Sequence, residues 1–348
     1  MKLTHFSTPL GEGTLISLTN ASGATATLST LGAGIVSVCV PDREGRMADV
    51  VLGYENPADY LADGPCAGKV PGRYANRIAR GHFSLDGKEF TLAVNNGPNH
   101  LHGGPTGFQN RLWTLVEHDA DHVVMQYTSA AGEEGYPGRL TARATYTWND
   151  DNSLRLDLEA IVEGEPTVVN LTNHAYWNLS GHASPSVLGH TLELKASRWL
   201  PTDDSLIPLP GAPAPVEGTP MDFTMAKPIG RDIKADFPAL KYGKGYDNCW
   251  AIDGYEAGKL QTAAILRDPA SGRSMEVRTT QPGVQVYTGN WLTGSPAGKD
   301  GAVYEDYCAV AIECQHYPDA PNRPDYPTTR LNPGETFHEI IEFHFRAE

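Results

Sequence analysis

The strongest constraint on the fold is a period-two alternation of apolar and polar residues, repeated many times between turn-forming segments. Alternation predicts half-buried strands, because successive side chains of a strand point to opposite faces. The candidate strands are 122–129, 139–148, 153–162, 190–196, 274–281, 283–291, 307–317 and 336–347. The chain also has 36 Gly and 26 Pro in 348 residues. A helical bundle does not tolerate so many helix breakers, whereas many strands joined by turns require them.

Helical spacing is scarce, and only 56–62 predicts a turn or two of helix. No repeat of 20–50 residues occurs, which excludes propellers and solenoids. The Pro-rich run 207–223 interrupts the strands without a shift in composition, so we expect a long surface connection there rather than a linker. The sequence therefore predicts an all-β protein, a large antiparallel β-sandwich in which residues 1–348 form a single domain.

The charge balance is acidic, with 27 basic and 42 acidic residues and a net charge of −15. The negative net charge argues against nucleic acid or an anionic membrane as the main partner, because binding to either requires a basic surface. We see no secretory signal and no apolar run long enough to cross a membrane. The five cysteines have no CxxC spacing, which predicts free thiols in a reducing compartment and a cytoplasmic location.

The common sequence motifs for cofactor and metal binding are absent or incomplete in this chain. Residues 64–70 are one residue short of a phosphate-binding loop, and 31–37 lack the third glycine of a dinucleotide-binding turn. No G-x-S-x-G marks a hydrolase. His100 and His102 would share one face of a strand and could hold a metal, but no carboxylate follows nearby to complete the site. We therefore expect no metal.

The densest polar and aromatic stretch is NLTNHAYWNL, residues 170–179. Interpreted as a strand, it places Asn170, Thr172 and His174 on one face. Amides and rings surround this histidine: Asn173, Tyr176, Trp177 and Asn178. Such groups bind sugar hydroxyls and stack on sugar rings. The alternative is a buried histidine that neighbouring amides satisfy.

Glu313 lies in an unusually apolar candidate strand. The alternation places Glu313 on the face of Ala309, Ala311 and Gln315, opposite Val310, Ile312 and Cys314. An acid there is costly unless it is paired or meets a ligand. Burial would raise its pKa from about 4.3 toward neutrality, which suits a general base. The alternative is a structural carboxylate paired with an arginine.

Weaker signals come from three other segments. In 72–81, Arg77 beside Asn76 is a candidate fixed donor, or else a surface arginine. Asp247 lies in a glycine-rich turn and could be no more than a turn residue. In 279–291, Gln281, Gln285 and Tyr287 alternate.

Six of these segments, in order along the chain, resemble the aldose 1-epimerase (galactose mutarotase) family. They are GRYANRI, NHLHGG, NLTNHAYWNL, GYDN, TTQPGVQVYTGN and ECQHYPDAPNRP, which span residues 72–324. The resemblance implies the family's fold, the galactose mutarotase-like supersandwich, in agreement with the strands and turns. It also implies an enzyme that interconverts the α and β anomers of free aldoses such as galactose or glucose. The expected partner is a monosaccharide, with no cofactor. We expect a monomer or a homodimer.

The resemblance also implies roles for individual residues. His174 matches the family's general acid, Glu313 its general base, and His102 a histidine that assists at the ring oxygen or holds the sugar. The residues that match substrate-binding positions are Asn76, Arg77, His102, Asp247 and Gln285. Glu313 as carboxylate would take the C1 hydroxyl proton while His174 as imidazolium protonates the ring oxygen, which predicts a bell-shaped pH profile.

Three other functions stay open from the sequence. A hexose-6-phosphate 1-epimerase would need additional Arg or Lys to bind the phosphate dianion. A non-catalytic sugar-binding protein would need the cavity without the acid and base. A glycosidase would use Asp247 and Glu313 as paired carboxylates.

Overall fold

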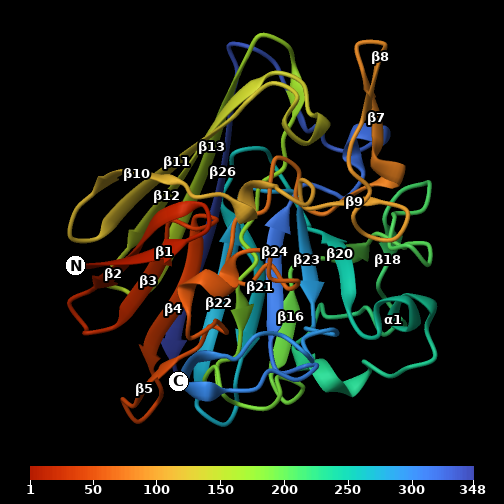
Figure 1. Cartoon of the computed structure of the whole chain (residues 1–348). Helices are drawn as coiled ribbons and strands as arrows, with labels where there is room; N and C mark the ends of the chain where they lie inside the picture. Colours follow the sequence, from red (N-terminus) through yellow and green to blue (C-terminus); the bar gives the residue numbers. More distant parts are fainter.

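Almost every regular element of the chain is a β-strand, as the alternation predicts (Figure 1). The computed structural model describes residues 1–348. The strands are β1 (Lys2–Thr8), β2 (Gly11–Thr19), β3 (Thr25–Ser29), β4 (Gly34–Pro41), β5 (Met47–Asp49), β6 (Arg77–Ile78), β7 (His82–Leu85), β8 (Lys88–Thr91), β9 (His100–Leu101), β10 (Thr114–His118), β11 (His122–Ser129), β12 (Arg139–Trp148), β13 (Ser153–Glu163), β14 (Thr167–Val168), β15 (Tyr176–Trp177), β16 (Thr191–Leu194), β17 (Arg198–Trp199), β18 (Ala214–Pro215), β19 (Lys227–Pro228), β20 (Asp247–Ala251), β21 (Gln261–Arg267), β22 (Arg273–Thr279), β23 (Gly283–Tyr287), β24 (Val310–Gln315), β25 (Arg330–Leu331) and β26 (Thr336–Ala347). The helices are α1 (Pro238–Gly243) and seven short 3-10 helices: η1 (Pro57–Tyr60), η2 (Ala79–Gly81), η3 (Phe108–Asn110), η4 (Glu133–Gly135), η5 (Ile229–Arg231), η6 (Lys299–Gly301) and η7 (Ala320–Asn322).

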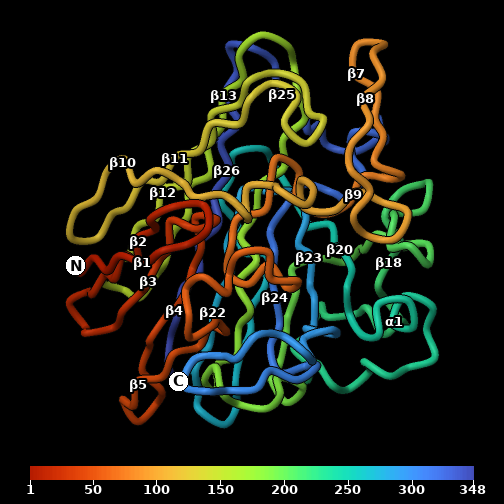
Figure 2. Tube along the Cα trace, viewed as in Figure 1, coloured from red at the N-terminus to blue at the C-terminus, as the bar shows by residue number.

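Three sheets make up the body of the molecule. The first has five strands in the order β1-β2-β3-β4-β5, the second nine in the order β10-β11-β12-β13-β26-β22-β21-β16-β19, and the third six in the order β15-β24-β23-β20-β17-β18. All strand pairings are antiparallel. The β7–β8 hairpin stands out from the body, and α1 lies at its edge (Figures 1 and 2). The predicted antiparallel β-sandwich is confirmed.

One hydrophobic core of 60 buried residues draws on all three sheets. On β12, for example, Leu140, Ala142, Ala144 and Tyr146 enter this core, while the residues between them are partly or fully exposed. On β24, Val310, Ile312 and Cys314 belong to the same core. Ala309 and Ala311 belong to a second cluster on the other side. The two faces predicted around Glu313 are therefore confirmed.

The prediction of a strand over 170–179 is wrong, because only Tyr176 and Trp177 form one, β15. Residues 170–174 are fully buried but irregular. Their backbone groups pair instead with a segment about a hundred residues earlier: His174 N–H donates to the Lys69 carbonyl, and Asn170 forms a parallel bridge with Tyr74. Alternation in this stretch therefore does not report which face a side chain takes.

The prediction that His100 and His102 share a face is also wrong. Strand β9 ends at Leu101, and His102 has a left-handed backbone with φ +52°. The His100 ring hydrogen bonds to the Ala93 carbonyl and the Tyr136 hydroxyl. The His102 ring lies against His174.

Element ends differ modestly from prediction. Strands 122–129, 139–148 and 336–347 have the predicted bounds, whereas 283–291 ends at Tyr287 and 307–317 shortens to β24. The predicted helical turn at 56–62 is η1, whose first turn the Asn56 side chain caps. The Pro-rich run contributes β18 to the edge of the six-stranded sheet. No helix has the length and apolarity needed to cross a membrane.

Candidate active site

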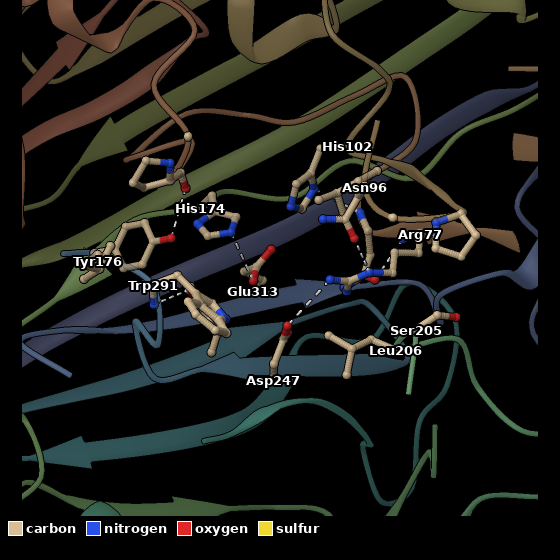
Figure 3. Close-up of a pocket in the computed structure, with 18 of the residues that line it drawn as sticks. Arg77, Asn96, His102, His174, Tyr176, Ser205, Leu206, Asp247, Trp291 and Glu313 are labelled. Carbon is tan, nitrogen blue, oxygen red and sulfur yellow. Dashed lines mark hydrogen bonds and ion pairs between the residues drawn. The ribbon is translucent and has the colours of Figure 1, made fainter. Parts of the chain in front are cut away.

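A cavity of about 750 Å³ lies where the six-stranded sheet meets the loops before β6, on both sides of β9, after β17 and after β23. It collects six of the seven residues that the sequence analysis assigned to the site, although they are far apart in the chain: Asn76, Arg77, His102, His174, Asp247 and Glu313. Figure 3 labels all of these except Asn76. The seventh, Gln285, does not line the cavity.

His174 and Glu313 face each other across the floor of this cavity (Figure 3). His174 Nε2 lies 3.5 Å from Glu313 Oε1. Both residues are buried, with 5% and 2% of their surface exposed. Glu313 comes from β24, whereas His174 is fixed by backbone hydrogen bonds to Gly68 and Lys69, each 2.9 Å. An acid–base pair is thus formed by two separate segments.

Burial changes the protonation of both members of the pair. It raises the pKa of Glu313 well above its usual value, the Asp247 charge adds to this, and Arg77 opposes it. Burial lowers the pKa of His174 to about 4, with a contribution from the Lys69 charge. The predicted rise at Glu313 is confirmed. Both shifts favour a single proton on Glu313 and a neutral His174 in the free protein, the reverse of the carboxylate and imidazolium that the mechanism requires.

His102 is a fixed hydrogen-bond donor. The Asn76 backbone N–H donates to His102 Nδ1 at 3.1 Å. A backbone N–H cannot accept a hydrogen bond, so Nε2 of the neutral ring must carry the proton. Burial, with the charges of His174 and Arg77, lowers the pKa of His102 well below its usual value. Its ring meets that of His174 edge-on, with centroids 5.3 Å apart.

The same three residues could be considered as metal ligands, because one atom from each of His102, His174 and Glu313 lies within 4.8 Å of the others. A histidine ligates through a lone pair. The Nδ1 lone pair of His102 already accepts from Asn76, and its Nε2 carries a proton. This donor set therefore fits proton transfer better than metal binding.

Polar groups with fixed partners form the other end of the cavity. Arg77 Nη2 lies 3.7 Å from Asp247 Oδ2, and Arg77 Nε donates to Asn96 Oδ1 at 3.0 Å (Figure 3). Gln285, which lies outside the cavity lining, donates from Nε2 to Asp247 Oδ1 at 2.7 Å. Gln285 therefore supports Asp247, and the sugar contact at Gln285 stays a prediction.

Several lining residues were not predicted. Asn96, Ser205 and Leu206 come from loops that carry no alternation. Trp291 stands at the mouth with 65% of its surface exposed (Figure 3). Lys244 Nζ lies 4.3 Å from the centre of its ring. Asn96 and Trp291 lie close in sequence to predicted motifs, whereas no sequence signal points to Ser205 and Leu206.

The family model described as aldose 1-epimerase matches residues 14–344. The chain belongs to the aldose 1-epimerase family. Among relatives in this family, the galactose mutarotase of Homo sapiens is 43% identical over 314 residues, which cover 90% of this chain and 89% of the relative. The aldose 1-epimerase of Escherichia coli K12 is 37% identical over 336 residues, 96% of this chain and 95% of the relative.

Solved structures of aldose 1-epimerase relatives have the same fold. An aldose epimerase homologue from C. elegans superposes with a TM-score of 0.87 at 32% identity, covering 96% of this chain and 98% of its own. The galactose 1-epimerase of Lactobacillus acidophilus gives a TM-score of 0.84 at 25% identity, with 99% of each chain covered.

Proposed function

We propose that this aldose 1-epimerase family member interconverts the α and β anomers of free aldoses such as galactose or glucose. The observation that carries the proposal is the buried pair of His174 and Glu313, 3.5 Å apart on the floor of a polar cavity. Opening a pyranose ring needs a base for the C1 hydroxyl proton and an acid for the ring oxygen. It involves no redox change, so these side chains can supply the whole chemistry.

During ring opening Glu313 takes one proton from the sugar and His174 gives one proton to it, so the pair keeps a single proton throughout. In the sugar complex the pair's single proton passes from Glu313 to His174, which gives a carboxylate and an imidazolium. Glu313 then takes the C1 hydroxyl proton while His174 protonates the ring oxygen, and the bond between C1 and that oxygen breaks. This step leaves protonated Glu313, neutral His174 and an open-chain aldehyde. Rotation about C1–C2 exposes the other carbonyl face, and the reverse transfers close the ring as the opposite anomer. Burial favours the protonated Glu313 and neutral His174 of the intermediate.

The remaining lining residues hold the sugar in this proposal. His102 donates from Nε2 near the ring oxygen, and Asn76, Arg77 and Asp247 bind hydroxyls. Gln285 acts through Asp247. Arg77 is the single Arg or Lys in the lining, which also contains three carboxylates. That balance favours a free sugar over a sugar phosphate, because a dianion would meet like charges there.

The cellular location and the domain organisation are also part of this proposal. All five cysteines are free thiols, which supports a cytoplasmic protein. We expect the whole chain, 1–348, to act as one domain, as a monomer or a homodimer.

Polarimetry of freshly dissolved α-D-glucose and α-D-galactose, in a weakly catalytic buffer, tests this function. The protein should speed the approach to the anomeric equilibrium for a free aldose and act poorly on glucose 6-phosphate. Glu313→Gln should keep sugar binding within about tenfold but lose turnover, since an amide still hydrogen bonds a hydroxyl. A wild-type protein that leaves the spontaneous rate unchanged for every aldose would contradict the proposal.

A further inference from the structure

Regular strand pairing stops just short of the catalytic pair. Strand β15 pairs with β24 at Tyr176–Ala311 and Trp177–Val310. Glu313 lies only two residues beyond that point on β24, yet the segment that carries His174 has no strand pairing with it. Backbone hydrogen bonds fix His174 on its other flank, to residues 68–69. Some other contact must fix its spacing from Glu313.

The side chain of Asn170 provides one such contact. Its Nδ2 donates to the His316 carbonyl at 3.3 Å, and its Oδ1 accepts from the His316 N–H at 2.9 Å. This is the double hydrogen bond that a neighbouring strand residue would make. Nδ2 also donates to the Ala75 carbonyl at 3.0 Å. One amide therefore ties Ala75, the residue next to Asn76, to His316, the residue directly after the strand that carries Glu313.

The side chain of Gln281 provides the second contact. Its Nε2 donates to the Leu171 carbonyl at 3.1 Å and to the Cys314 carbonyl at 2.9 Å. Leu171 precedes His174 by three residues, and Cys314 follows Glu313 directly. Like Asn170, Gln281 has no exposed surface. Its hydrogen bonds therefore do not compete with water and hold a defined geometry.

We propose that the buried amides of Asn170 and Gln281 are positioning residues that set the spacing of His174, Glu313 and the Asn76–Arg77 segment. The inference rests on the proposed function and deepens it. Neither amide lines the cavity, so neither touches the sugar. Proton transfer requires hydrogen-bond reach of about 2.6–3.2 Å. A shift of about 1 Å in such a group lowers the rate by about 100-fold.

The test compares these amides with a buried amide of the same segment that does not line the cavity and whose hydrogen bonds reach no residue next to His174 or Glu313. Asn178 has no exposed surface, and its Nδ2 also donates to two backbone carbonyls, those of Ser184 and Cys308. Asn170→Ala and Asn178→Ala are therefore matched substitutions. Gln281→Met keeps the side-chain length and removes both donors. For each variant, kcat, KM, the pH profile and the melting temperature are measured with α-D-galactose or α-D-glucose.

We expect Asn170→Ala and Gln281→Met to lower kcat by about 10- to 100-fold, with KM within about threefold. Their pH profiles should also shift, because the separation of His174 and Glu313 sets how the two groups titrate. Asn178→Ala should lose comparable thermal stability while keeping kcat and its pH profile.

Equal kcat in all three variants at matched loss of stability would overturn the inference. So would failure of both Asn170→Ala and Gln281→Met to fold, since the amides would then determine the fold and not the spacing. A wild-type protein without activity contradicts the proposed function instead, so the two failures are distinguishable.

Discussion

Replacing Glu313 with glutamine should abolish turnover and yet stabilise the protein. Glu313 is 2% exposed, and its Oε2 has no hydrogen-bond partner. Its carboxyl group therefore has to keep its proton in the folded interior, and at neutral pH this costs free energy that an amide of the same shape does not. Without the base, the rate of mutarotation should fall by about 10²–10⁴-fold.

The stabilisation should grow with pH, and its slope follows from proton linkage. In the unfolded chain Glu313 loses its proton above about pH 4.3, whereas its raised pKa keeps it protonated in the folded protein. The wild type therefore loses about 1.4 kcal/mol of stability per pH unit between these two pKa values. For 348 residues the unfolding entropy is about 0.7 kcal/mol/K. Each pH unit should thus widen the difference in melting temperature by about 2 °C.

Calorimetric melts of the wild type and Glu313→Gln, taken at unit steps from pH 5 upward, measure this difference. The difference should widen steadily and level off at the raised pKa of Glu313. Over this range Glu313 is uncharged in the folded wild type and His174, with a pKa of about 4, is neutral in both folded proteins, so His174 contributes equally to both series. Parallel melting curves across the series would show that Glu313 is ionised in the folded protein, and the account of the shared proton would be refuted.

Three further outcomes are expected. The kcat/KM profile should fall below about pH 4, where His174 is protonated as well as Glu313. It should fall again above the raised pKa of Glu313, where the pair has lost its proton. A flat profile would contradict this. Asp247→Asn removes a charge that raises the pKa of Glu313, so the alkaline limb should move to lower pH, and an unmoved limb would mean that the two carboxylates do not interact. Trp291→Ala should raise KM by about 3- to 10-fold through lost ring stacking but leave kcat and the melting temperature nearly unchanged, because the side chain is 65% exposed; a large drop in melting temperature would mean that Trp291 supports the fold.

Alternation predicted the long strands well because it has a direct physical cause. On β12 and β26 one face packs into the core and the other meets solvent, so sequence and strand share the same bounds. On β24 both faces are buried, but one meets the main core and the other the cavity side. The place of Glu313 was therefore predictable from its neighbours.

The surroundings of His174 were not predictable in this way. Every residue from 170 to 179 is buried, so polarity no longer distinguishes one face from another. The partners of this segment lie far away in sequence, at residues 68–75 and 314–316. The proton position on His102 likewise depends on a single amide 26 residues away, that of Asn76. No local pattern carries such information.

The two faces of strand β24 contribute to different properties, one to the stability of the core and the other to catalysis. Val310, Ile312 and Cys314 pack into the main core, and Glu313 lies between two of them on the opposite face. Substitutions that refill the interior beneath this strand will also move the carboxyl group on its other side. Variants selected for a higher melting temperature at these three positions will therefore also differ in catalytic rate.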